Sequence, residues 1–218
     1  TDTFCWRPFT DMVLIDKFYK PCCYYTKNLS LQSLETVNEE IRNDIKANRW
    51  NIGCDVCRIT EQDGNTNSHR FKYFGEKNPQ LYEENKFNLQ NLELIVDNNC
   101  NIACITCGSN SSSRWAAENR KMNERDTNRP HSVDLDKILE INLWENVRKL
   151  TLYGGEPMYS KKVAKILEWV VENNFASKIK LEFFSNGTIF NPDVINLIKI
   201  NLIRMLHTDH ASECMNIH

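Results

Sequence analysis

The chain has 218 residues, and its 27 lysines and arginines against 29 aspartates and glutamates give a net charge of −2. An apolar fraction of 41% and a charged fraction of 26% are typical of a folded protein of one large or two small domains. A charge this close to neutral argues against nucleic acid as a partner. No apolar run approaches the roughly 20 residues of a membrane helix, so no membrane association is expected. The first residues lack the pattern of a signal peptide, which favours the cytoplasm, where cysteines stay reduced.

The first third of the chain is expected to form a small, cysteine-rich region. Residues 12–15 and 22–25 are predicted to pair as a hairpin across residues 16–21. Residues 36–48 are predicted to form a helix, because Val37, Ile41 and Ile45 recur at fourfold spacing. The segment 54–68 is polar and rich in turn residues. A region with so little apolar material usually needs an additional cross-link to fold stably, and a bound metal can provide one.

The rest of the chain alternates strands and helices. Strands are predicted over residues 92–96, 149–153 and 179–184, helices over 112–122, 135–144, 161–173 and 193–200, and the start of a fourth strand at 203–206. Such alternation indicates right-handed βαβ units around a parallel sheet. Ligands of these sheets bind in the loops after the strands. We therefore expect three distinctive loops, at residues 97–108, 154–157 and 185–188, to converge.

Three of the nine cysteines lie in the first of these loops. Cys100, Cys104 and Cys107 fall within eight residues. Three thiolates can bind one face of an iron–sulfur cluster and leave one iron without a protein ligand. The alternatives are a zinc site, which usually takes four protein ligands, and a chance grouping.

These cysteines and two later motifs resemble the radical SAM superfamily. The C-x3-C-x2-C loop follows one strand, Gly154-Gly155-Glu156-Pro157 follows a second, and Ser185-Asn186-Gly187-Thr188 follows a third. The resemblance covers roughly residues 91–190. It implies that the three cysteines hold a 4Fe–4S cluster that binds S-adenosylmethionine (SAM) and generates a 5′-deoxyadenosyl radical. It also implies a reductant such as ferredoxin or flavodoxin.

The same resemblance assigns SAM contacts to the two later loops. They are Gly154, Gly155 and Glu156 in the first and Ser185 and Asn186 in the second. An ordinary turn is the alternative for both loops. Thr106 stands where the family often has an aromatic residue, which leaves the packing of the adenine open.

The remaining early cysteines form a second candidate metal centre. It comprises Cys5, Cys22, Cys23, Cys54 and Cys57. With Glu61, Gly64, Ser68 and Arg70 after the last of them, this pattern resembles the twitch or SPASM-type auxiliary module of radical SAM proteins that act on peptides. It implies a second 4Fe–4S cluster, with one of Cys22 and Cys23 spare, and a peptide or protein substrate. A structural zinc site is the alternative.

The predicted fold class is therefore α/β. We expect a twitch-like cysteine-rich module at residues 1–85, a partial (β/α) TIM-like barrel of the radical SAM type at 86–206, and an irregular tail at 207–218. Three to four βα units are fewer than the family's usual six or so, so a C-terminally truncated chain is expected. Two functions remain open: a radical SAM enzyme or fragment, and a non-catalytic iron–sulfur or zinc-binding truncated module.

Overall fold

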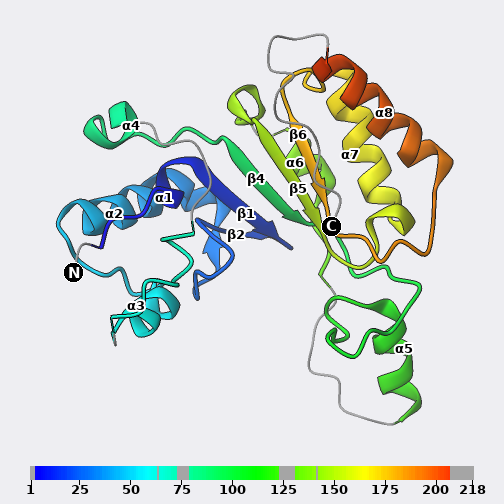
Figure 1. Cartoon of the computed structure of the whole chain (residues 1–218), viewed down its shortest axis with the longest axis horizontal. Helices are drawn as coiled ribbons and strands as arrows, with labels where there is room; N and C mark the ends of the chain where they lie inside the picture. The colour runs from blue at the N-terminus through cyan, green and yellow to red at the C-terminus, as the bar shows by residue number, and fades with distance from the viewer. Residues whose placement is uncertain (1–2, 63, 73–78, 123–130, 141, 207–218) are drawn as a thin grey trace. The chain divides into compact units, whose positions relative to one another are not determined.

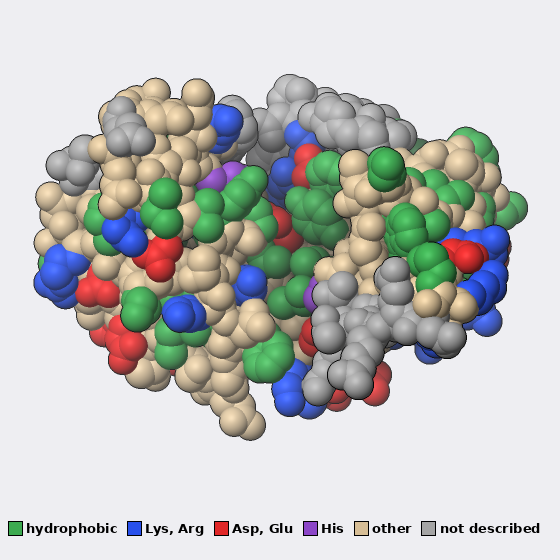
Figure 2. Space-filling view, turned by 90° about the horizontal axis from the view of Figure 1, so that it is seen from below, with side chains coloured by type: hydrophobic (Ala, Val, Ile, Leu, Met, Phe, Trp, Pro, Cys, Tyr) green, Lys and Arg blue, Asp and Glu red, His purple; other side chains and the backbone are tan. Residues whose placement is uncertain are grey.

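The computed structural model describes residues 3–62, 64–72, 79–122, 131–140 and 142–206. The chain divides into two compact units, Thr1–Leu92 and Glu93–His218 (Figure 1). The predicted irregular tail, residues 207–218, lies outside the described residues. Side chains of both charge signs are interspersed on the visible surface, as the near-neutral net charge leads one to expect (Figure 2). None of the described helices is both long and apolar enough to cross a membrane.

In its described residues, the first unit contains three short strands and four helices. The strands are β1 (Asp11–Ile15), β2 (Phe18–Lys20) and β3 (Leu29–Ser30). The helices are α1 (Arg7–Thr10), α2 (Leu34–Lys46), α3 (Asp55–Glu61) and α4 (Pro79–Glu83), with a 3-10 turn at Leu31–Ser33. Strand β2 pairs antiparallel with β1 on one side and with β3 on the other. The predicted helix over residues 36–48 is confirmed as α2.

The hairpin in this unit differs from the one predicted. Strand β1 pairs with β2 in the register Ile15↔Phe18, so only two residues form the loop. Asp16 adopts a φ of 55°, which a short aspartate side chain tolerates in such a tight turn. Pro21 then ends β2, since proline has no N–H for the ladder. The predicted partner strand, residues 22–25, is instead a turn in which the Tyr25 N–H donates to the Cys22 carbonyl at 3.1 Å.

The core of the first unit lies against one face of α2. Ile41 and Ile45 are buried together with Tyr25. Partly buried residues pack against them: Phe4, Cys5, Cys22, Leu29, Val37 and Cys54. Three of the five candidate cysteines of this unit therefore lie at the edge of its hydrophobic core.

The second unit alternates strands and helices as predicted. Strands β4 (Asn91–Ile95), β5 (Lys149–Tyr153) and β6 (Lys180–Phe183) are neighbours in that order. The helices are α5 (Ser113–Lys121), α6 (Leu135–Leu139), α7 (Lys161–Glu172) and α8 (Pro192–Leu206), with 3-10 turns at Trp144–Asn146 and Pro157–Tyr159. Strands β5 and β6 are parallel, from Lys149↔Lys180 to Leu152↔Phe183. Parallel strands joined through helices fit a partial β/α fold.

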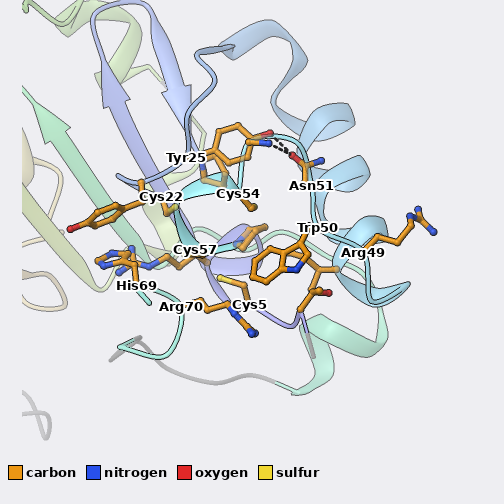
Figure 3. A pocket seen from close by; sticks show the side chains of 17 residues that line it. Cys5, Cys22, Tyr25, Arg49, Trp50, Asn51, Cys54, Cys57, His69 and Arg70 are labelled. Atoms are coloured by element: carbon orange, nitrogen blue, oxygen red, sulfur yellow. Dashed lines mark hydrogen bonds between the residues drawn. The ribbon is translucent and has the colours of Figure 1, made fainter. Parts of the chain in front are cut away.

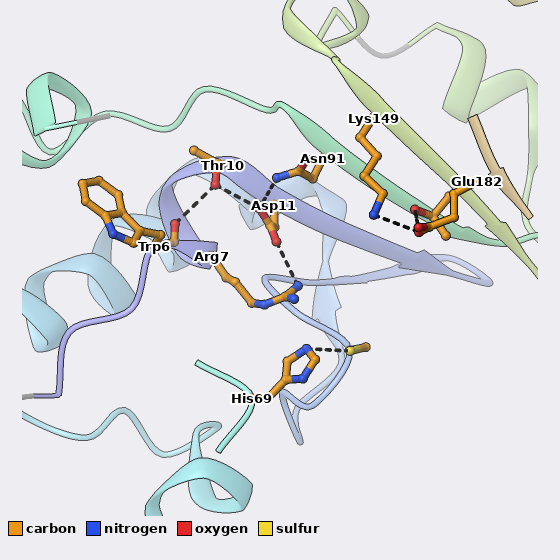
Figure 4. A network of polar contacts seen from close by, with 10 residues as sticks. Trp6, Arg7, Thr10, Asp11, His69, Asn91, Lys149 and Glu182 are labelled. Atoms are coloured by element: carbon orange, nitrogen blue, oxygen red, sulfur yellow. Dashed lines mark hydrogen bonds and ion pairs between the residues drawn. The ribbon is translucent and has the colours of Figure 1, made fainter. Parts of the chain in front are cut away.

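Side chains alternate between the two faces of β5 and β6. Leu150, Leu152, Leu181 and Phe183 are buried, as are Val163, Ile166, Leu167 and Val170 of α7. The opposite face of the two strands is more polar: Glu182 accepts a hydrogen bond from Thr151 at 3.1 Å and pairs with Lys149 at 2.8 Å (Figure 4). This alternation fixes which side chains face away from the helices.

Two sequence predictions in this unit are wrong. The expected fourth strand at residues 203–206 belongs to α8, which is capped by Asn191 and contains no glycine or proline after Pro192 to end it. The expected helix over residues 135–144 ends at Leu139. Trp144 instead begins a 3-10 turn, and its indole N–H donates to the Ile138 carbonyl at 2.8 Å.

Candidate functional site

The cysteine loop after β4 is held by the start of α5. The Ser112 side chain caps that helix and also donates to the Ile102 carbonyl at 2.8 Å. Ser113 Oγ accepts from the Cys100 N–H and contacts the Cys100 carbonyl, both at 3.1 Å. The Trp115 indole donates to the Cys104 carbonyl at 2.7 Å. These bonds fix the backbone that carries two of the three cysteines.

The Gly154-Gly155 segment packs directly on the beginning of this loop. A Cβ at Gly154, whose φ is 143°, would lie 2.3 Å from the Asp97 carbonyl oxygen, and one at Gly155 would lie 2.1 Å from that of Asn99. The same backbone approach forms two hydrogen bonds, Gly155 N to Asp97 O at 2.9 Å and Glu156 N to Asn99 O at 2.7 Å. Both glycines are thus required by the neighbouring loop, whatever ligand the cavity takes.

Glu156 joins the second loop to the third. Its side chain is 1% exposed. One carboxylate oxygen accepts from the Ser185 hydroxyl at 2.8 Å and from the Met158 N–H at 2.9 Å, and the other accepts from the Asn186 N–H at 2.7 Å. A buried carboxylate with these three donors holds both loops in one arrangement.

A cavity of about 250 Å³ lies where the three loops meet. Its described lining comprises Cys100, Ile102, Cys104, Cys107, Ser111, Gly155, Phe184, Ser185 and Asn186. The predicted convergence of the three loops is thus seen within this unit. Of the residues predicted to contact SAM, Gly155, Ser185 and Asn186 line the cavity, whereas Gly154 and Glu156 are not among its described lining residues.

Several residues at this site were missed by the sequence reasoning. Phe184 lines the cavity and stacks on Tyr153, with ring centroids 4.8 Å apart. Buried Asp97 accepts from the Asn99 N–H at 2.9 Å and from the Ser160 hydroxyl at 2.6 Å, which shapes the entry to the cysteine loop. A polar residue at the end of an apolar strand, directly before a cysteine loop, was the available indication for Asp97.

A second cavity, of about 30 Å³, lies inside the first unit (Figure 3). Four cysteines line it: Cys5, Cys22, Cys54 and Cys57. Cys54 and Cys57 stand at the start of α3, about one helical turn apart. Arg7, Trp50, Asn51, His69 and Arg70 are also among its lining residues.

Cys22 and Cys23 are separated by this geometry. Cys22 lines the cavity, whereas Cys23 is exposed and is not among the described lining residues. Its sulfur instead lies 3.4 Å from Nε2 of His69, a contact also drawn in Figure 4. The neighbouring Tyr24 ring packs on the same imidazole, with centroids 4.2 Å apart.

Loss of water raises the pKa values of three of the thiols that line this cavity, those of Cys5, Cys22 and Cys54. Desolvation raises the pKa of Cys5 and of Cys54 to about 12, and it also raises that of Cys22. A metal centre here would therefore have to displace protons from these sulfurs as it binds.

A buried ion pair links two cysteine-bearing segments of the first unit. Arg70 Nε donates to Glu61 Oε1 at 2.6 Å, and Nη2 of Arg70 pairs with Oε2. Ser68 donates to the same carboxylate, and Arg70 Nη1 donates to the Phe4 carbonyl at 2.8 Å. The pair thus connects the end of α3, which carries Cys57, to the residue before Cys5.

A second ion pair of the first unit holds another lining residue of the cysteine cavity, Arg7. Arg7 Nη1 pairs with Asp11 Oδ2 at 2.9 Å (Figure 4). The other Asp11 oxygen accepts from the Thr10 hydroxyl at 2.9 Å and from the Asn91 side chain at 2.8 Å. These bonds hold Arg7, a lining residue, beside the cysteine cavity.

Thiols dominate the donor sets of the two cavities, and thiolates bind both zinc and iron–sulfur clusters. Tetrahedral zinc, with Zn–S bonds near 2.3 Å, needs sulfurs about 3.8 Å apart. Among the described residues, no three histidine, cysteine, aspartate or glutamate side chains come together in this way.

The fold and the first of these sites define an α/β protein with a three-cysteine cavity beyond the carboxyl ends of its strands. Residues 94–209, just over half of the chain, match the family model described as the radical SAM superfamily. The chain belongs to the radical SAM superfamily, as the sequence motifs predicted. Searches of curated proteins and of solved structures each return no match.

Proposed function

We propose that this chain is a radical SAM enzyme in which Cys100, Cys104 and Cys107 hold a 4Fe–4S cluster with one iron left for SAM. The observation that carries the proposal is the meeting of three loops at one cavity: the cysteines line it together with Gly155, Ser185 and Asn186. When bound, the cluster supplies the electron that cleaves SAM to a 5′-deoxyadenosyl radical. The protein's part is to position the cluster and SAM and to exclude water from them.

Individual residues of the chain would divide this work. Ser185 Oγ and the Gly155 backbone stand on the cavity and can meet the polar groups of SAM. Glu156 would hold the Ser185 loop in place, because its carboxylate accepts hydrogen bonds from the Ser185 hydroxyl and from the Asn186 N–H. Phe184 offers an aromatic face at this cavity in a chain where Thr106 replaces the family's frequent aromatic residue.

We further propose an auxiliary 4Fe–4S cluster in the first unit. Its ligands would be Cys5, Cys22, Cys54 and Cys57, which line one cavity, with Cys23 as the spare thiol. The likeness of the early cysteine pattern to twitch or SPASM modules supports a peptide or protein substrate, and the parallel strands of the second unit suit a partial TIM-like barrel. A ferredoxin or flavodoxin reductant and a cytoplasmic location complete the proposal. Zinc in the first unit, or a non-catalytic module, is the alternative.

Anaerobic reconstitution of the full chain with iron and sulfide tests the proposal. About eight irons per chain and 5′-deoxyadenosine production with SAM and dithionite are expected. Cys104→Ala should abolish SAM cleavage and leave about four irons. Ile105→Ala is the matched control, since this neighbouring side chain is 94% exposed, and it should retain both properties. Zinc in place of iron at Cys100, Cys104 and Cys107 would refute the proposal.

A further inference from the structure

The side-chain amide of Asn186 lies against a cluster-binding cysteine. Its Nδ2 is 3.8 Å from the Cys100 sulfur and 3.1 Å from Asn101 Oδ1. An amide nitrogen carries two N–H donors, so each contact can use one of them. One donor of Asn186 is therefore directed at the Cys100 sulfur.

The orientation of this amide is fixed by its other end. The Thr188 backbone N–H lies 3.0 Å from Asn186 Oδ1, and the Thr188 hydroxyl lies 2.6 Å from the same atom. A backbone N–H only donates, so the atom that faces it must be the amide oxygen. The nitrogen consequently faces Cys100, and the alternative flip would place two donors against each other.

The position of the amide is fixed as well. Asn101 Nδ2 donates to the Thr188 hydroxyl at 2.8 Å, which closes a ring of hydrogen bonds among Asn101, Thr188 and Asn186. The Asn186 backbone N–H is held separately by buried Glu156 at 2.7 Å. The donor therefore stands at the sulfur before any ligand enters the cavity.

We propose that Asn186 is a positioning residue of the cluster rather than a SAM contact, and that its hydrogen bond to the Cys100 thiolate raises the reduction potential of that cluster. Reduction adds negative charge, part of which rests on the ligating sulfurs, and an N–H donor stabilises that charge. The inference rests on the proposed function, since it needs the cluster at Cys100. It adds a residue that sets how readily the cluster accepts an electron.

Redox titration followed by EPR, without SAM, tests this role. The parent is the full chain carrying Cys54→Ala and Cys57→Ala, so that only one cluster is observed. Asn186→Ala and the near-isosteric Asn186→Asp both remove the donor. We expect each to lower the ratio of reduced to oxidised cluster at a given applied potential by up to about tenfold, or ~59 mV for a one-electron couple.

Asn101→Ala is the matched control. It cuts the ties of Asn101 to Asn186 and Thr188, yet the bonds from Thr188 still orient the Asn186 donor toward Cys100. Its potential should stay close to that of the parent. An equal shift in this control would show that loop order, and not the donor, sets the potential, and would overturn the inference.

The remaining outcomes are distinct from failure of the proposed function. A parent that binds no iron at Cys100 overturns both. A parent with a cluster and Asn186 variants of unchanged potential overturn the inference alone, and a loss of SAM affinity in those variants would then return Asn186 to SAM binding. Loss of iron from both Asn186 variants also counts against it, because a tuning donor is not needed to hold the cluster.

Discussion

The buried pair of Glu61 and Arg70 offers the sharpest test of how the first unit is held together. Each side chain is 6% exposed. Arg70→Met keeps much of the side-chain volume but removes both contacts to Glu61 and the bond to the Phe4 carbonyl. It leaves a carboxylate buried with Ser68 as a remaining donor. Breaking a buried pair in this way costs about 3–5 kcal/mol of unfolding free energy.

A double-mutant cycle separates the pair from its surroundings. Replacing both partners of a buried pair by apolar residues is often neutral or stabilising, so Glu61→Leu with Arg70→Met should recover most of the loss. Anaerobic urea unfolding followed by the fluorescence of the five tryptophans is the assay; the ring centroid of one of them, Trp50, lies 5.1 Å from the central carbon of the Arg70 guanidinium. Iron content of the first unit provides a second measurement.

Two results would refute this reasoning. A loss below about 1 kcal/mol for Arg70→Met would place the pair among surface ion pairs of little weight. A double variant whose loss equals the sum of the two single losses would show no coupling between the partners. In either case the spacing of Cys5 and Cys57 would have to depend on other contacts.

Three further predictions concern single residues. Cys22→Ser should cost the first unit its iron whereas Cys23→Ser should not, and equal iron loss in the two would contradict the assignment. Gly155→Ala forces a Cβ to within 2.1 Å of the Asn99 carbonyl oxygen, so iron at the second unit should be lost without loss at the first; normal iron content would show that the loop can shift. Desolvation alone would raise the pKa of Glu61, but hydrogen bonds from Arg70 and Ser68 lower it overall. Its stabilisation is then present above the unfolded glutamate pKa of about 4.3 and is lost as pH falls through the lower folded value. Between pH 6 and pH 3, Glu61→Gln should lose less unfolding free energy than the parent chain, and equal slopes would contradict the shift.

Much of the second unit could be predicted from the sequence because its chemistry is local. The cysteine spacing and the glycine pair each lie within one loop, and the apolar strands before them indicate a parallel sheet. The contact of the glycines with the neighbouring loop could not be predicted: Gly154 and Gly155 lie against the backbone of residues 97–99, while Gly155 also lines the cavity. The role of Glu156 as a link between loops also depends on a contact across 29 residues.

The first unit was harder to predict because its elements are short. The register of β1 depends on the tight turn at Asp16. Because only two residues form this loop, the strand that pairs with β1 is β2 and not the predicted residues 22–25. The difference between Cys22, which lines the cavity, and Cys23, which is not among its described lining residues, is one that no spacing rule could give. The prediction of a strand at residues 203–206 was wrong because these residues end a long helix. A short apolar run near the end of a long helix has the same pattern as a short strand.

The central claim is that Cys100, Cys104 and Cys107 hold a cluster whose free iron binds SAM. EPR of the reduced, reconstituted full chain, recorded with and without SAM, tests it most directly. A spectrum that changes on SAM addition in the parent and in Ile105→Ala, but not in Cys104→Ala, is the predicted result. A cluster at these cysteines whose spectrum does not respond to SAM, or zinc in its place, would contradict the account.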